Sequence, residues 1–147
     1  MCFGIQTESG QITFEYLLIT AAFFSFMLML LGPLEKALDT AIFSVDALAA
    51  ESFGRELNSA SKSLSLLGEG SAKKAESKVL TNWHIFNDQS GLVIEISSEK
   101  LGITKKFNTG IHANFTEMHI AKKVSLTISK EKGGLMIYAD ADAPELQ

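Results

Sequence analysis

The chain has 147 residues, a formal net charge of −4 at pH 7 and one cysteine, Cys2. This length suits one ordinary domain, or one membrane segment followed by a small domain. The negative charge lies in residues 1–67, which carry three basic and seven acidic residues (3 − 7 = −4), whereas residues 68–147 are balanced. A near-neutral distal part argues against nucleic-acid binding, which needs a basic face. A single cysteine excludes an intrachain disulfide and a thiolate metal cage.

Residues 1–10 lack the positively charged region of an ordinary secretory signal. Residues 16–31 then contain 14 apolar residues in 16 and no charge. With residues 12–14 added, the stretch approaches the roughly 20 residues that cross a bilayer of about 30 Å. One carboxylate, Glu15, stands at its start, and a charged group inside a membrane helix usually has a function and a partner. No small-residue cleavage site follows Leu31, so we expect the segment to be retained.

Gly32-Pro33 is expected to loosen or kink the helix, because proline removes one backbone hydrogen-bond donor and clashes with the preceding turn. The apolar pattern then resumes with spacings of three and four residues, which predicts an amphipathic helix over residues 34–67 with Gly68 as its C-cap. Charged residues, Asp46 among them, are expected to lie off the apolar stripe. The predicted stripe consists of Leu34, Leu38, Ala41, Ile42, Val45, Leu48, Ala49, Phe53, Leu57, Ala60, Leu64 and Leu67.

Residues 68–71 (Gly-Glu-Gly-Ser) are expected to form a flexible connection, and residues 72–78 are expected to link it to the first strand. Beyond them the apolar period changes to two, which predicts an antiparallel sheet of roughly four to six strands that the striped helix covers. The fold class is therefore α+β, a long N-terminal hydrophobic helix followed by a small antiparallel β head. We expect strands at residues 79–86, 92–97 and 103–107, one within 111–120, a hairpin at 124–139 that turns at 131–134, and a frayed tail at 140–147.

Gly10 and the following Gln11-Ile12-Thr13-Phe14-Glu15-Tyr16-Leu17 resemble the class III signal peptide of archaeal type IV pilin-like proteins. In that family a Gly precedes the cut, Gln follows it, Ser stands two residues further on, and Glu-Tyr-Leu comes next. Thr13 keeps the hydroxyl of that Ser. Leaders of the family usually carry Lys or Arg before the Gly, whereas this chain has Glu8-Ser9. Proteins of the family also have a long N-terminal helix and a β-rich head, which is similar to the layout expected for this chain.

The resemblance implies four parts: a cleaved leader (1–10), a transmembrane and filament-core helix (11–33), an amphipathic helix that packs on the head (34–67), and an antiparallel β head (68–147). A prepilin peptidase would cut between Gly10 and Gln11. The precursor would cross the cell membrane once with its head outside, and the processed protein would join an extracellular filament. The implied partners are the peptidase, a pilus assembly platform with its ATPase, and further copies in a homopolymeric helical filament, with cell adhesion as one role.

Glu15, Gln11 and Tyr16 are the expected assembly residues. In a filament core Glu15 needs a cation, and no Lys or Arg precedes Lys36. The new α-amino group of Gln11 on a neighbouring copy would supply this cation. Breaking a buried ion pair by removing one partner costs about 3–5 kcal/mol. The pair would therefore fix the axial register, which apolar helix contacts alone leave free.

Other interpretations remain open. Glu15 at the headgroup boundary is compatible with a single-span, membrane-anchored extracellular binding module, and the helix stripe with an accessory subunit such as a minor pilin or pseudopilin. No catalytic motif occurs, so we expect neither an enzyme nor a cofactor. His84, His112 and His119 match no metal motif and are expected to be ordinary surface residues, so no metal site is predicted. Asn114-Phe115-Thr116 is a glycosylation sequon, which makes Asn114 a candidate site of modification after export.

Overall fold

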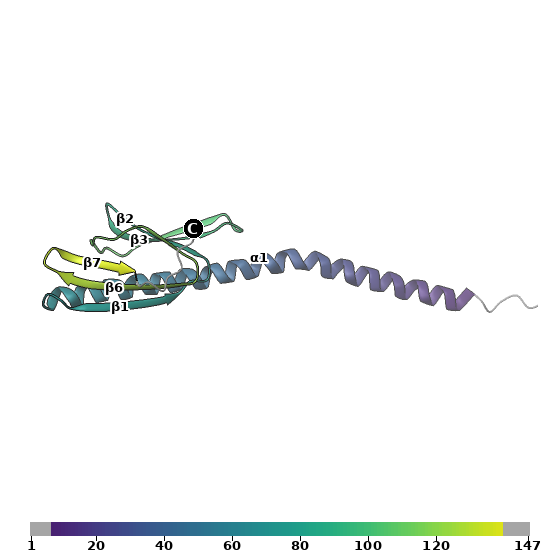
Figure 1. The fold of residues 1–147 in the computed structure, drawn as a ribbon. Helices are drawn as coiled ribbons and strands as arrows, with labels where there is room; N and C mark the ends of the chain where they lie inside the picture. The colour runs from purple at the N-terminus through teal and green to yellow at the C-terminus, as the bar shows by residue number, and fades with distance from the viewer. Residues whose placement is uncertain (1–6, 140–147) are drawn as a thin grey trace, which may run out of the picture. The chain divides into compact units, whose positions relative to one another are not determined.

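A computed structural model describes the backbone of residues 7–139 and the side chains of residues 13–139. It confirms the predicted α+β class: one long helix is followed by antiparallel strands (Figure 1). The chain divides into two compact units, Met1–Leu38 and Asp39–Gln147. The described elements are α1 (Thr7–Leu66), β1 (Ala72–Lys78), β2 (Asn82–Asp88), β3 (Gly91–Ser98), β4 (Ile103–Asn108), β5 (Met118–Ile120), β6 (Lys123–Glu131) and β7 (Gly134–Ala139).

Helix α1 continues through Pro33 without a break, so the amphipathic part predicted after it belongs to the same helix. Proline removes one backbone hydrogen bond from the helix. The residues on both sides of Pro33 are mostly Leu, Ala, Met, Glu and Lys, which are strong helix formers and keep the remaining bonds in place. The predicted tail, residues 140–147, lies outside the described residues.

Within the second unit, α1 buries one face against the strands. The predicted stripe is correct for Phe53, Leu57, Ala60 and Leu64, and Ala49 is partly buried against the same core. It is wrong for Leu67, which is 49% exposed, and for Ile42, Val45 and Leu48, which are 45%, 55% and 65% exposed. Phe43 and the small residues Ala47 and Ala50 take the buried positions instead. Spacing alone could not distinguish the two stripes, since both recur every three or four residues. The buried hydrophobic residues of α1 are Phe43, Ala47, Ala50, Phe53, Leu57, Ala60 and Leu64.

The strands form two antiparallel sheets, not the single sheet that we predicted. One has the order β1-β6-β7 and the other β4-β3-β2-β5. Strand β1 was missed because only Ala75 among its seven residues is buried, so it shows no apolar alternation. The strand predicted to start at Val79 starts at Asn82, because residues 79–81 form a connection held by helix α1.

The two sheets and α1 share one core. The C-terminal part of α1 runs beside β1 and β6 (Figure 1). Trp83 is fully buried, with its ring centroid 5.9 Å from that of Phe53. Trp83 and Ile85 of β2 and Ile94 and Ile96 of β3 are all fully buried and share the inner face of the sheet. The alternate residues point to the other face, where Val93 is also buried.

A lysine from the sheet caps the C-terminus of α1. Lys130 Nζ donates hydrogen bonds to the carbonyls of Ser65 and Leu67, at 2.9 and 2.8 Å. Gly68 does not adopt the left-handed conformation of a glycine C-cap, so that prediction was wrong. The expected flexible connection is also tied down, because Gly70 N donates to Lys130 O and Lys130 N donates to Ser71 O, both at 2.9 Å.

Candidate functional site

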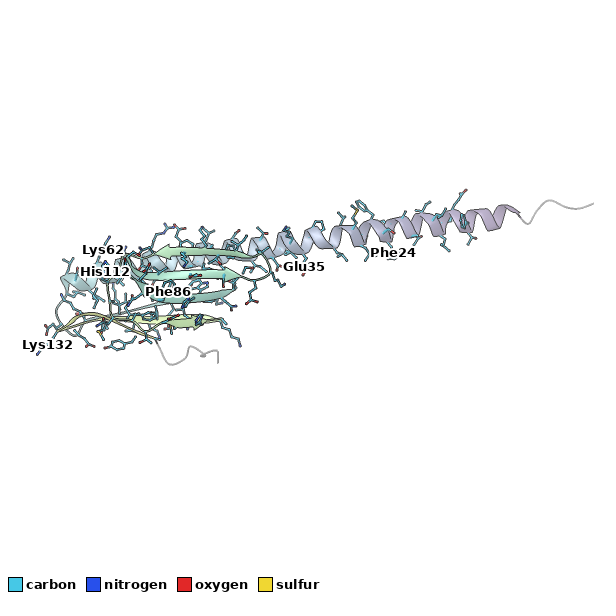
Figure 2. The ribbon with its side chains drawn as sticks, turned by 90° about the horizontal axis from the view of Figure 1, so that it is seen from above. Phe24, Glu35, Lys62, Phe86, His112 and Lys132 are labelled. Atoms are coloured by element: carbon cyan, nitrogen blue, oxygen red, sulfur yellow. The ribbon has the colours of Figure 1, made fainter. Side chains whose placement is uncertain are left out.

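The segment expected to cross a membrane lies in the first unit. Helix α1 contains an 18-residue window that is long and apolar enough to span a bilayer, and none of this window is buried. Its large side chains between residues 14 and 31 expose from 47% (Leu30) to 78% (Met29) of their surface. Figure 2 shows these side chains, Phe24 among them, projecting from the helix. Nothing in the described first unit covers them. Lipid or the apolar side chains of other helices must therefore cover this segment to keep it out of contact with water.

Glu15 and Tyr16 are both exposed at the start of this segment, and Tyr16 is 69% exposed. Since the first basic residue is Lys36, Glu15 has no cation near it in the described part of one chain. The predicted partner, the α-amino group of a processed Gln11 on another copy, is by definition absent from a single uncut chain. The Glu15 carboxylate is therefore exposed and has no cation beside it within the described residues of one chain.

Gly10 and Gln11 lie within the first turns of α1, which begins at Thr7. A protease cleft takes extended backbone, so cleavage between them requires this end of the helix to unwind. The first four N–H groups of a helix have no intrahelical partner, and helix ends open at little free-energy cost. The predicted cleavage site is thus at a position where local unwinding is cheap.

One functional candidate escaped the sequence analysis. Asp46 was expected off the stripe but is fully buried. Its Oδ1 accepts a hydrogen bond from Leu80 N at 2.9 Å, and its Oδ2 accepts from Thr81 N at 3.0 Å, Trp83 Nε1 at 2.8 Å and the Thr81 hydroxyl. The carboxylate thus fixes α1 to the connection that enters β2. No local pattern shows this role, because all of its donors lie more than 30 residues away in the sequence.

The sequon residue Asn114 is exposed, while its backbone is anchored to β7. Asn114 N donates to Leu135 O, and Asn114 O accepts from Ile137 N, both at 3.3 Å. Its side chain borders a hollow of about 370 Å³ that His112 also lines. A glycan on Asn114 would therefore project from a fixed point of the β head.

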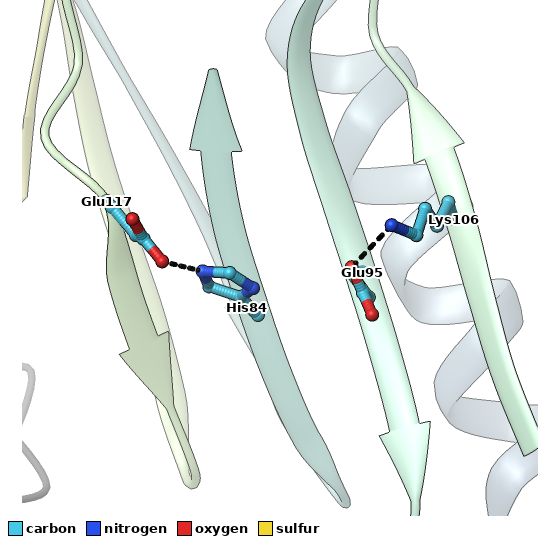
Figure 3. Close-up of polar contacts among 4 residues, drawn as sticks. All are labelled: His84, Glu95, Lys106 and Glu117. Atoms are coloured by element: carbon cyan, nitrogen blue, oxygen red, sulfur yellow. Dashed lines mark hydrogen bonds and ion pairs between the residues drawn. The ribbon is translucent and has the colours of Figure 1, made fainter. Parts of the chain in front are cut away.

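The structure brings two of the three predicted surface histidines together. His84 on β2 and His119 on β5 are directly opposite each other, and their rings stack with centroids 4.2 Å apart and planes 6° apart. Glu117 Oε1 lies 2.5 Å from His84 Nε2. Figure 3 shows this contact beside the ion pair of Glu95 and Lys106, whose atoms are 3.0 Å apart. His112 is not part of the group.

A second hollow, of about 600 Å³, lies between α1 and β4. Charged side chains line it, including Arg55, which pairs with Glu51 at 2.9 Å, and Lys105. Asn58 and Asn108 also line it, and none of its described lining residues is a serine, cysteine or histidine.

Comparison of the chain with models of protein families, with curated proteins and with solved structures finds no match.

Proposed function

We propose that the chain is a structural subunit of an archaeal type IV pilus-like surface filament, processed after Gly10 and polymerised through the N-terminal part of α1. The observation that carries the proposal is the uncovered apolar segment of α1, which follows a lone carboxylate and precedes a separately packed β head. The leader-like sequence around Gly10 and Gln11 supports it. In this proposal the protein has a structural role, which is to polymerise with further copies of itself into the filament.

The physical basis is that the same apolar surface suits two environments. Before assembly, lipid covers the side chains of residues 14–31; after assembly, the corresponding helices of neighbouring copies cover them. Each large side chain buried in this way contributes about 1.5–3 kcal/mol relative to exposure to water. The exposed residues Ile42, Val45 and Leu48 offer further apolar contact on the helix next to the head.

Processing is tested first. The intact mass of the native protein should correspond to loss of residues 1–10, with any sugar on Asn114 visible in the same spectrum. Gly10→Val should leave a full-length precursor in the membrane, because the larger side chain does not fit beside the scissile bond. Normal processing of this variant contradicts the proposed cut.

Assembly is tested with Glu15→Gln, which keeps the shape and removes the charge. Processing should be unchanged, and the yield of sheared filaments should fall roughly tenfold or more, since a buried pair lost at every subunit costs several kcal/mol. Glu35→Gln, at an exposed glutamate further along α1, is the matched control and should retain the native yield. A native yield from Glu15→Gln contradicts the role of Glu15.

The same measurements separate the alternatives. A single-span binding module predicts an uncut chain that begins at Met1 and forms no filament. An accessory subunit predicts a processed chain in a complex of small, fixed stoichiometry.

A further inference from the structure

We propose that His84, His119 and Glu117 form a binding site for a divalent transition metal of the zinc type on the outer face of the four-stranded sheet. Their ligand atoms all lie within 4.8 Å of one another. This site is independent of the proposed filament function and was not predicted from the sequence.

The strand register places the two histidine side chains on one face. His84 and His119 are opposite each other in the β2–β5 pair, and side chains of directly opposed residues point to the same side of a sheet. Glu117 lies directly before β5, and its Oε1 is 2.5 Å from His84 Nε2. Backbone pairing therefore holds the two imidazoles side by side, and the Glu117 carboxylate reaches them from the adjoining loop.

The donor chemistry fits a borderline metal. Two imidazoles and one carboxylate match the three protein ligands that zinc sites with an open fourth position commonly use. Imidazole nitrogen favours zinc, copper or nickel, whereas magnesium and calcium prefer sites made of oxygen alone. Glu117 supplies the negative charge, and the nearby charge of Lys106 is balanced by Glu95.

Closure around an ion requires only side-chain adjustment. Ligand bonds of about 2.0–2.2 Å in a tetrahedron place the donor atoms about 3.3 Å apart. His84 Nε2 and Glu117 Oε1 are 2.5 Å apart and would separate slightly, while the stacked rings of His84 and His119 would tilt towards each other. Glu117 is 63% exposed and His119 is also exposed, so both side chains have room for such rotation.

Binding would join the shortest strand of the sheet to its neighbour. Strand β5 has three residues and pairs with β2 through three residue pairs, from Trp83–Ile120 to Ile85–Met118. A metal held from both strands would link them through side chains in addition to their backbone hydrogen bonds. Metal binding would therefore raise the thermal stability of the head, because a ligand that binds only the folded state stabilises it.

The test is isothermal titration of the full-length chain in detergent micelles with zinc chloride, in a Cys2→Ser background that removes the only thiol. We expect one zinc ion per chain, an increase in melting temperature on zinc addition, and no binding of magnesium chloride. His119→Ala and the isosteric Glu117→Gln should each weaken zinc binding roughly tenfold or more. Losses of this size are found even when the residue removed only hydrogen-bonds to a metal ligand.

His112→Ala is the matched control, because His112 is an exposed histidine outside the group. It should bind zinc with the native affinity. Glu117→Gln alters an exposed side chain and should not unfold the sheet, which circular dichroism checks for each variant. The proposal is overturned if the native chain takes up no zinc, or if His119→Ala and Glu117→Gln bind it as tightly as His112→Ala does.

Discussion

Asp46 shows how one residue can set the position of a helix on a sheet. Burial of a carboxylate is costly unless hydrogen bonds satisfy its oxygens. Here the donors of Leu80, Thr81 and Trp83 all converge on it, so only one placement of α1 along the sheet satisfies them together. Apolar contacts around Phe53 stabilise the packing of α1 on the sheet, but they select one position of the helix along the sheet less strictly. The buried carboxylate thus contributes specificity as well as stability.

Removal of this carboxylate should therefore destabilise the head strongly. We expect Asp46→Ala to lower the free energy of unfolding by about 3 kcal/mol or more, because several buried donors lose their acceptor at about 1–3 kcal/mol each. Asp46→Asn keeps the volume but turns one acceptor into a donor that faces other donors, and should cost about 2 kcal/mol. Thermal melts followed by circular dichroism, together with the fluorescence of Trp83, measure both variants.

Asp39→Asn is the matched control on the same helix. Asp39 is 22% exposed, and its oxygen lies 3.4 Å from Lys100 Nζ. A partly solvated ion pair contributes about 0–1 kcal/mol, so this change should have a small effect. Equal destabilisation by Asp39→Asn and Asp46→Ala would show that Asp46 has no special role in the fold.

At the level of elements, the spacing of apolar residues was enough to predict the helices and strands that bury one regular face. The long helix, the strand around Ile94 and the hairpin of β6 and β7 were predicted because their apolar residues recur with a clear period. Strand β1 could not be predicted, since its pairing with β6 and its ion pairs hold a polar segment in place. The grouping of His84 with Glu117 and His119, and the burial of Asp46, arise from contacts between residues that are distant in the sequence. A single sequence shows no pattern that predicts such contacts.

The pairing of β1 with β6 should depend on pH. The hydrogen bonds of Lys123 and Lys74 with Glu76, at 2.8 and 2.9 Å, lower the pKa of Glu76 from 4.5 to about 2. Because the pKa is lower in the folded state, the stabilisation is fully present above about pH 4.5 and is lost as the pH falls towards 2. Glu76→Gln should therefore lower the melting temperature modestly at about pH 6, and the difference should disappear near pH 2.

Added salt should reduce the same difference, since Glu76 lies at the surface and its ion pairs are screened. Glu99→Gln is the control, at an exposed glutamate that pairs with no described basic residue. It should leave the melting temperature unchanged over this range. A pH-independent difference between Glu76→Gln and the native chain would contradict the proposed effect of the ion pairs.

At the level of the whole molecule, the two units are stable in different solvents. The second unit has its own hydrophobic core, from Phe43 to Ile137, whereas the large apolar side chains of the first unit are exposed throughout. Burial of apolar surface is the main favourable term in folding and in association. The second unit can satisfy that term within one chain, but the first unit satisfies it only in lipid or against other chains.

A chain shortened to Asp39–Gln147 tests this division directly. All the core residues found among residues 13–139 lie in this range. We therefore expect it to fold without detergent, with strand-rich circular dichroism and the blue-shifted fluorescence of a buried Trp83. It should sediment as a small species at concentrations at which the processed full-length chain requires detergent or forms filaments. Ile42, Val45 and Leu48 remain exposed in it, and their replacement by Ser should remove any residual weak association. Filaments formed by the shortened chain would show that the head, and not the apolar segment of α1, drives polymerisation.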